Sequence, residues 1–78
     1  MFSLDAVVEL VRIAGTVRPA ASVIQAAESI RRMLENNPHE IGYPLSEGLF
    51  YVDGEPLRAF FMIDDDAMLV EVTDFRIL

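Results

Sequence analysis

Apolar residues between Leu4 and Ala14 recur every three or four positions, the spacing that gathers side chains on one face of an α-helix. Ser3 precedes this run as a residue that commonly caps a helix N-terminus, and Gly15 follows it as a residue that commonly ends a helix. The sequence therefore predicts a short amphipathic helix over residues 4–15. Its expected apolar face is formed by Leu4, Val7, Val8, Val11 and Ala14.

A second helical pattern begins near Pro19, a residue suited to the first turn of a helix, and stops at Asn36-Asn37-Pro38. Its apolar positions are Val23, Ala27, Ile30 and Leu34. Only residues 16–18 separate the two patterns, so we expect an antiparallel helix hairpin over about residues 4–36. Two helix-spaced ion pairs, each worth about 0.2–0.5 kcal/mol, are expected to support it: Glu9 with Arg12 and Glu28 with Arg32.

The second half of the chain changes to short β-rich runs separated by turn residues. The turns are expected at Gly48, at Asp53-Gly54-Glu55-Pro56 and at Asp64-Asp65-Asp66. This order predicts a three-stranded antiparallel β-meander over about residues 48–77. The whole chain, residues 1–78, is then a single α+β domain in which a two-helix hairpin packs on the meander.

The alternation within the last two strands predicts two apolar sheet faces. If the Asp64-Asp65-Asp66 turn places Met62 opposite Met68, one face carries Arg58 and Phe60, and the other carries Phe61, Ile63, Leu69 and Phe75. Two helices cover only one face, so we assign those last four residues to a partner interface. The outer edge of the last strand, Leu69 to Phe75, is expected to be unpaired and to favour association.

Composition narrows the function classes. The chain has 78 residues, no cysteine, six arginines, no lysine and thirteen acidic residues, for a net charge of −7. Disulfides and thiolate chemistry are excluded, and the negative charge makes a nucleic-acid partner unlikely. No apolar run reaches the roughly 20 residues of a membrane span, and MFSLDAVVEL lacks the basic residues of a signal peptide, so we expect a cytoplasmic protein.

Few residues suggest site chemistry on their own. His39 is the only histidine and is expected to be a solvated loop residue. The run Asp64-Asp65-Asp66 lacks the ligand spacing and the glycine of a calcium loop, which favours a solvated hairpin tip. Tyr51 is expected to be a packed strand aromatic. The sequence therefore predicts no metal and no cofactor.

The order of landmarks in the second half resembles the core of the RelE/ParE toxin superfamily of type II toxin–antitoxin systems. The resembling features, over about residues 19–78, are the approach Gly42-Tyr43-Pro44-Leu45, Arg58 at the start of the middle strand, and a last strand that runs to Arg76. The family's first strand and terminal segment have no evident counterpart here. The resemblance therefore implies a truncated or divergent member.

In the mRNA-cleaving members of this superfamily, arginines, lysines and a terminal tyrosine orient RNA and stabilise charge at the phosphate. The resemblance implies that Arg58 and Arg76, by their positions, are the candidate catalytic residues. No lysine accompanies them. Asp53, Glu71 and Asp74 are nearby acidic residues, so structural ion pairs are an equally good explanation for both arginines.

Three functional hypotheses remain open. The first is a toxin-fold protein that acts mainly through protein association without robust nuclease activity, with a homodimer or a cognate antitoxin-like protein as partner. The second is an active toxin, either a ribosome-dependent mRNA endonuclease or a gyrase inhibitor. The third is a structural homodimer with no ligand. The excess of acidic residues favours the first hypothesis.

Overall fold

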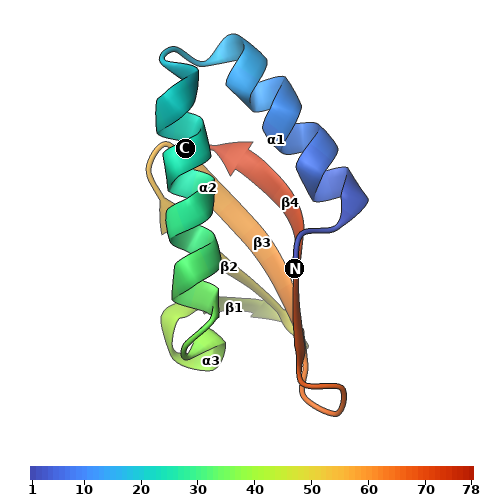
Figure 1. The fold of residues 1–78 in the computed structure, drawn as a ribbon. Coiled ribbons are helices and arrows are strands. Elements are labelled where there is room, and N and C mark those ends of the chain that lie inside the picture. The colour runs from blue at the N-terminus through green and yellow to red at the C-terminus, as the bar shows by residue number, and fades with distance from the viewer.

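Two helices lie side by side on one face of an antiparallel sheet in the computed structural model, which describes residues 1–78 (Figure 1). They are α1 (Leu4–Thr16) and α2 (Ala20–Leu34), and a single turn, α3 (Pro38–Ile41), leads into the sheet. The Ser3 hydroxyl accepts a hydrogen bond of 3.1 Å from the backbone N–H of Ala6, as expected of an N-cap. None of the helices is long and apolar enough to cross a membrane.

The sheet has four strands in the order β1-β2-β3-β4, not three as the sequence predicts. The strands are β1 (Tyr43–Ser46), β2 (Leu49–Gly54), β3 (Leu57–Asp64) and β4 (Leu69–Ile77). The additional strand is β1, in which Pro44 interrupts any strand pattern. Every residue of β1 is exposed, so the strand lacks the alternation of apolar and polar residues that would predict it. Gly48, with φ of +78°, provides the left-handed turn between β1 and β2.

The register between β3 and β4 differs from the predicted one. Met62 pairs with Glu71 and not with Met68, because Met68 has φ of +55° and belongs to the turn. A bulge next to Phe60 and Phe61 then shifts the rest of the pairing by one residue. An odd shift exchanges the two faces of a strand, so residues 69–72 lie on the faces opposite to those predicted, whereas the bulge returns Phe75 to the predicted face beside Phe61.

Two of the predicted interface residues lie in the core, because the helices cover the face that carries them. Phe61 and Phe75 are fully buried beneath the helices, and neither can contact a partner. The largest fully buried side chains are Phe61, Phe75, Ile13, Ile30, Leu57, Val23 and Val72. On α2 the predicted apolar positions are all buried, but Glu28 pairs with Arg31 rather than with Arg32, and Arg31 also reaches Glu35.

Helix α1 buries a different face from the one that its apolar spacing predicts. Ala6 and Ile13 are fully buried, whereas the side chains of Leu4, Val7, Val8 and Val11 are exposed to solvent. Apolar residues occur on both sides of this helix, so the spacing identifies a helix without identifying its inner side. The small side chain of Ala6 allows α1 to lie close to β4, which is the strand that it covers (Figure 1).

Residues 1–3 occupy part of the β4 edge that the sequence predicts to be open. Phe2 pairs in parallel with Val72, whose N–H donates to the Met1 carbonyl at 2.8 Å and whose carbonyl accepts from the Ser3 N–H at 2.9 Å. The Phe2 ring meets the Phe75 ring edge-on, with centroids 5.2 Å apart. The segment therefore acts as a short parallel edge strand and removes the strongest argument for pairing at this edge.

Candidate functional site on the open sheet face

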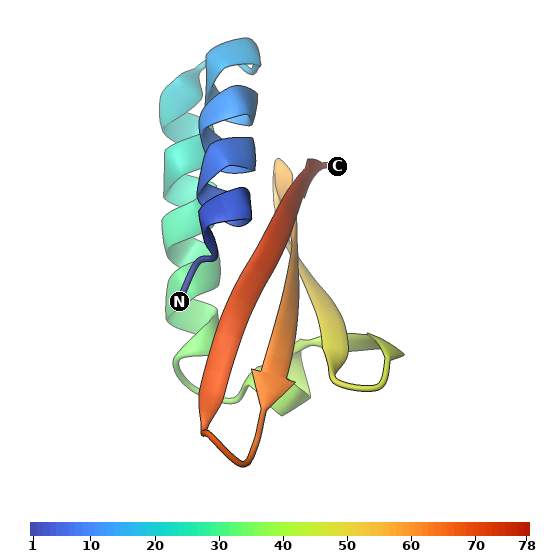
Figure 2. The same cartoon turned by 90° about the vertical axis from the view of Figure 1, so that its right-hand side faces the viewer.

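The face of the sheet opposite the helices is uncovered (Figure 2). Paired residues on neighbouring strands point to the same side, so the register defines the rows of side chains on this face. One row runs from Tyr43 through Tyr51 to Phe60, and the row beside it contains Asp53, Arg58 and Arg76. The open face therefore combines an aromatic row with two arginines.

The aromatic row extends across β1, β2 and β3. The rings of Tyr43 and Tyr51 are stacked, with centroids 5.2 Å apart and planes inclined by 26°. The ring of Phe60 follows at 6.5 Å from Tyr51 with a tilt of 50°. These are favourable spacings for aromatic pairs, and they give the face a continuous surface of flat, partly apolar side chains.

Arg58 lies against this row and is held by an aspartate. Its Nε and Nη2 donate to the two carboxylate oxygens of Asp53 at 2.7 and 3.0 Å, a bidentate arrangement. Its Cζ lies 4.3 Å from the centroid of the Tyr51 ring. The hydrogen bond from Arg58 holds the pKa of the Asp53 carboxyl below its usual range, and the same bond raises the pKa of the Arg58 guanidinium.

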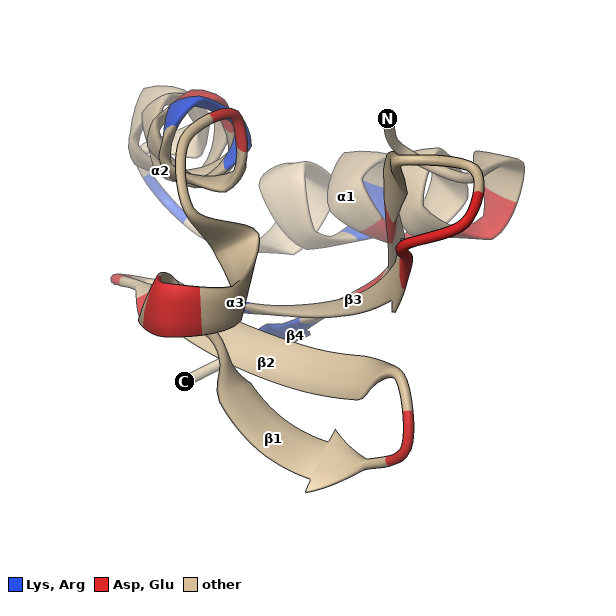
Figure 3. Cartoon of the chain, turned by 90° about the horizontal axis from the view of Figure 1, so that it is seen from below, with Lys and Arg blue, Asp and Glu red and all other residues tan.

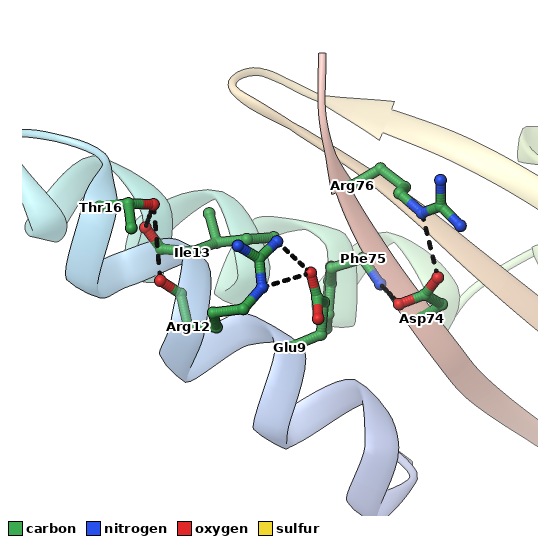
Figure 4. A network of polar contacts seen from close by, with 7 residues as sticks. All are labelled: Glu9, Arg12, Ile13, Thr16, Asp74, Phe75 and Arg76. Atoms are coloured by element: carbon green, nitrogen blue, oxygen red, sulfur yellow. Dashed lines mark hydrogen bonds and ion pairs between the residues drawn. The ribbon is translucent and has the colours of Figure 1, made fainter.

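Arg76 is the cross-strand partner of Arg58 and also has an acidic neighbour. Its Nε donates to Asp74 at 3.2 Å (Figure 4). Its Cζ lies 6.0 Å from the centroid of the Phe60 ring. The other Asp74 oxygen accepts from the Phe75 N–H at 2.9 Å. The Arg76 side chain is 70% exposed, so it is the more accessible of the two arginines.

The structure thus brings together only part of the predicted site. Arg58 and Arg76 are neighbours on the open face, and the ion pairs anticipated with Asp53 and Asp74 are both present. Of the remaining predicted interface residues, Leu69 is exposed at the far end of this face, whereas Ile63 points to the helix side and is half-buried. The aromatic row beside the arginines was not predicted, because Tyr43 belongs to the strand that the sequence pattern misses.

His39 lies apart from the arginines. It belongs to α3, where its Nε2 is 2.8 Å from an Asp65 oxygen and its ring meets Phe50 edge-on at 5.8 Å. Asp65 follows the end of β3 opposite Arg58, so no histidine is placed to serve as a general base beside the arginines. No group of three or more histidine or acidic side chains is arranged to hold a metal ion.

The open face carries more acidic than basic side chains and does not form a basic surface. The two arginines share the face with Asp53, Asp74 and Glu71. Acidic side chains also occupy α3, the β1–β2 turn and the β3–β4 turn, which lie together at one end of the molecule (Figure 3). A phosphate chain approaching this end or this face would meet more carboxylates than guanidiniums.

Comparison with known proteins identifies the fold. No protein-family model matches the sequence, and no curated protein matches it. The structure is similar to a chain in the crystal structure of the toxin–antitoxin complex RelBE2 from Mycobacterium tuberculosis, with a TM-score of 0.79 and 21% sequence identity. The match covers 100% of this chain and 94% of that chain. The predicted α+β class is confirmed, and the chain shares its fold with that chain of the toxin–antitoxin complex.

Proposed function

We propose that this chain is a RelE/ParE-type toxin-fold protein that acts mainly by binding a protein partner through its open sheet face, without robust nuclease activity. The observation that carries this proposal is the pairing of both exposed arginines with aspartates on the same face, Arg58 with Asp53 and Arg76 with Asp74. An arginine that is already neutralised attracts a phosphate weakly, and the net charge of −7 opposes approach of RNA.

The same face has the composition of a protein-binding surface. Tyrosine and arginine are the residues that most often dominate binding energy at protein interfaces, and Tyr43, Tyr51 and Arg58 lie together here. The similar chain from M. tuberculosis belongs to a toxin–antitoxin complex, which supports an antitoxin-like protein as the partner. Such a partner would place apolar side chains on the aromatic row and polar groups near Arg76.

Binding can be measured against the protein encoded by the neighbouring gene. Isothermal titration with the purified proteins should show a complex, and Tyr51→Ala should weaken it about 30-fold, as expected for loss of about 2 kcal/mol at an interface centre. His39→Ala is the matched control, because His39 is an exposed aromatic residue away from the face. Equal weakening by both variants, or unchanged affinity in Tyr51→Ala, would argue against this surface.

A second candidate function is ribosome-dependent mRNA cleavage, which the side-by-side placement of Arg58 and Arg76 favours. Primer extension on mRNA from a purified translation system distinguishes the two functions. The association proposal predicts that cleavage by the wild-type chain equals that of the Arg58→Ala/Arg76→Ala double variant. Strong cleavage by the wild-type chain that the double variant lacks would make the protein an endonuclease. Circular dichroism should show that the double variant remains folded.

A further inference from the structure

Helix α1 presents an apolar surface that nothing in the chain covers. Leu4, Val8 and Val11 are 78%, 60% and 67% exposed, although aliphatic side chains of this size are usually buried. Figure 2 shows α1 nearest the viewer with no other element in front of it. A row of exposed aliphatic side chains marks an interaction surface. This surface is on the helical side of the molecule and is separate from the open sheet face.

The spacing of the exposed residues along α1 is the same whether it is counted from the N-terminus or from the C-terminus of the helix. At 100° per residue, Leu4, Val8, Val11 and Gly15 share one line on the side opposite Ala6 and Ile13, and we call these four residues the α1 stripe. Their spacing of four, three and four residues is symmetric about a point between Glu9 and Leu10. A stripe with this symmetry can pair with itself when the two helices run in opposite directions.

We propose that a second copy of this chain docks on the α1 stripe, with the two α1 helices antiparallel about a two-fold axis. Leu4 of each copy then meets Gly15 of the other, and Val8 meets Val11. An ideal Cβ on Gly15 would have no neighbouring atom within 4 Å, so space exists there for the leucine of the other copy. The large residue therefore faces the small one at both ends of the contact.

The charged residues beside the stripe agree with this direction. Asp5 and Arg12 are separated by seven residues and lie on the same flank of the stripe. In an antiparallel two-fold pair, equivalent flanks face each other in reverse order, which brings Asp5 of one copy close to Arg12 of the other at two places. In its own chain Asp5 forms no ion pair, and Arg12 forms an ion pair with Glu9, on the inner side of the same flank.

A parallel pair would be less favourable. Parallel helices bring opposite flanks together, so the Asp5 and Arg12 flank would face the Val7 side of the other helix, where no charged residue of α1 lies. The aligned helix dipoles of a parallel pair would also oppose association, whereas antiparallel dipoles favour it. Shape and charge therefore select the same arrangement.

Sedimentation equilibrium over a concentration series tests the surface. We expect the wild-type chain to form a dimer at about 0.15 M salt and Val8→Lys to raise the dimer Kd more than about tenfold. Ile24→Lys is the matched control, because Ile24 is an aliphatic residue of similar exposure on α2. It should leave the Kd unchanged. A wild-type monomer at every concentration, or equal effects of the two lysines, would overturn the proposal.

Disulfide trapping tests the direction, because the chain contains no cysteine. A mixture of Leu4→Cys and Gly15→Cys should yield the mixed disulfide under mild oxidation. Leu4→Cys alone should not cross-link, since its two copies would lie eleven residues apart along the helices, about 16 Å, beyond the roughly 7 Å limit for a disulfide. Efficient cross-linking of Leu4→Cys with itself, or failure of the mixed pair, would refute the antiparallel arrangement.

Discussion

Substitution of Gly42 by alanine tests how closely the start of the sheet packs on the core. Gly42 has φ of −82° and ψ of 145°, which any residue can adopt, so its backbone does not require glycine. An added Cβ would, however, lie 2.5 Å from Phe61 Cζ, 3.0 Å from the Pro38 carbonyl oxygen and 3.1 Å from Phe50 Cβ. The Phe61 ring is fully buried and stacked on Phe50 with centroids 5.6 Å apart, so it has little room to move away.

The expected magnitude follows from two opposing effects. Overpacking of a core usually costs about 1–3 kcal/mol. Replacing glycine by alanine where the backbone permits it stabilises a protein by about 0.4–1 kcal/mol through the unfolded state. The steric effect is larger, so we expect Gly42→Ala to lower the free energy of unfolding by about 1–2 kcal/mol. For a domain of this size that corresponds to a fall in Tm of about 5–15 °C.

Urea unfolding followed by circular dichroism measures this change, and Gly15→Ala supplies the matched control. Gly15 is in α1 with no atom within 4 Å of an ideal Cβ, so alanine there should raise the free energy of unfolding by about 0.4–1 kcal/mol. Both variants should be made in the Val8→Lys background so that self-association does not contribute. If Gly42→Ala were as stable as its parent, the packing argument around Phe61 would be refuted.

Three further predictions concern the core, a helix cap and the open face. In chemical denaturation, Phe61→Ala should lower the free energy of unfolding by about 3–5 kcal/mol. Leu69→Ala, at an exposed site, should change it by less than about 0.5 kcal/mol. Similar effects of the two variants would show that Phe61 is not in the core. Ser3→Ala should lower the free energy of unfolding by about 1 kcal/mol because the N-cap hydrogen bond is lost. An unchanged Tm would contradict the capping role of Ser3. The carboxyl of Asp53 should titrate below the usual value of about 3.9 in an NMR pH series and return toward it in Arg58→Ala. Because folding lowers this pKa, the small stabilisation from the Asp53–Arg58 pair should be present at neutral pH and should be lost as the pH falls below about 4 through the lowered pKa. A stabilisation that increased in acid would contradict the ion pair.

The fold class could be predicted because its signals are local. Three- and four-residue spacing identifies the two helices, and turn residues separate the last three strands. The arrangement of the faces could not be predicted, because it depends on how many residues the β3–β4 turn takes up. The left-handed conformation of Met68 and the bulge beside Phe60 together decide which side of β4 meets the helices, and neither has a sequence signal of its own.

The candidate site shows the same limit. Arg58 and Arg76 could be selected because their positions resemble those of arginines in the RelE/ParE superfamily, and Asp53 and Asp74 as plausible acidic neighbours. The stacking of Tyr43 on Tyr51 could not be predicted, because it depends on the β1–β2 register and Pro44 interrupts the strand pattern of β1. On α1, likewise, spacing alone could not distinguish the buried side from the exposed one, because both sides are apolar.

The two aspartates on the open face have a physical role that links stability to function. Arg58 and Arg76 are direct cross-strand partners, and like charges in this relation destabilise a sheet. Asp53 and Asp74 offset the repulsion because each neutralises one arginine. The same pairing lowers the attraction of the face for phosphate while leaving its aromatic row exposed. This pairing therefore supports the proposal that the face binds a protein partner and not an RNA backbone.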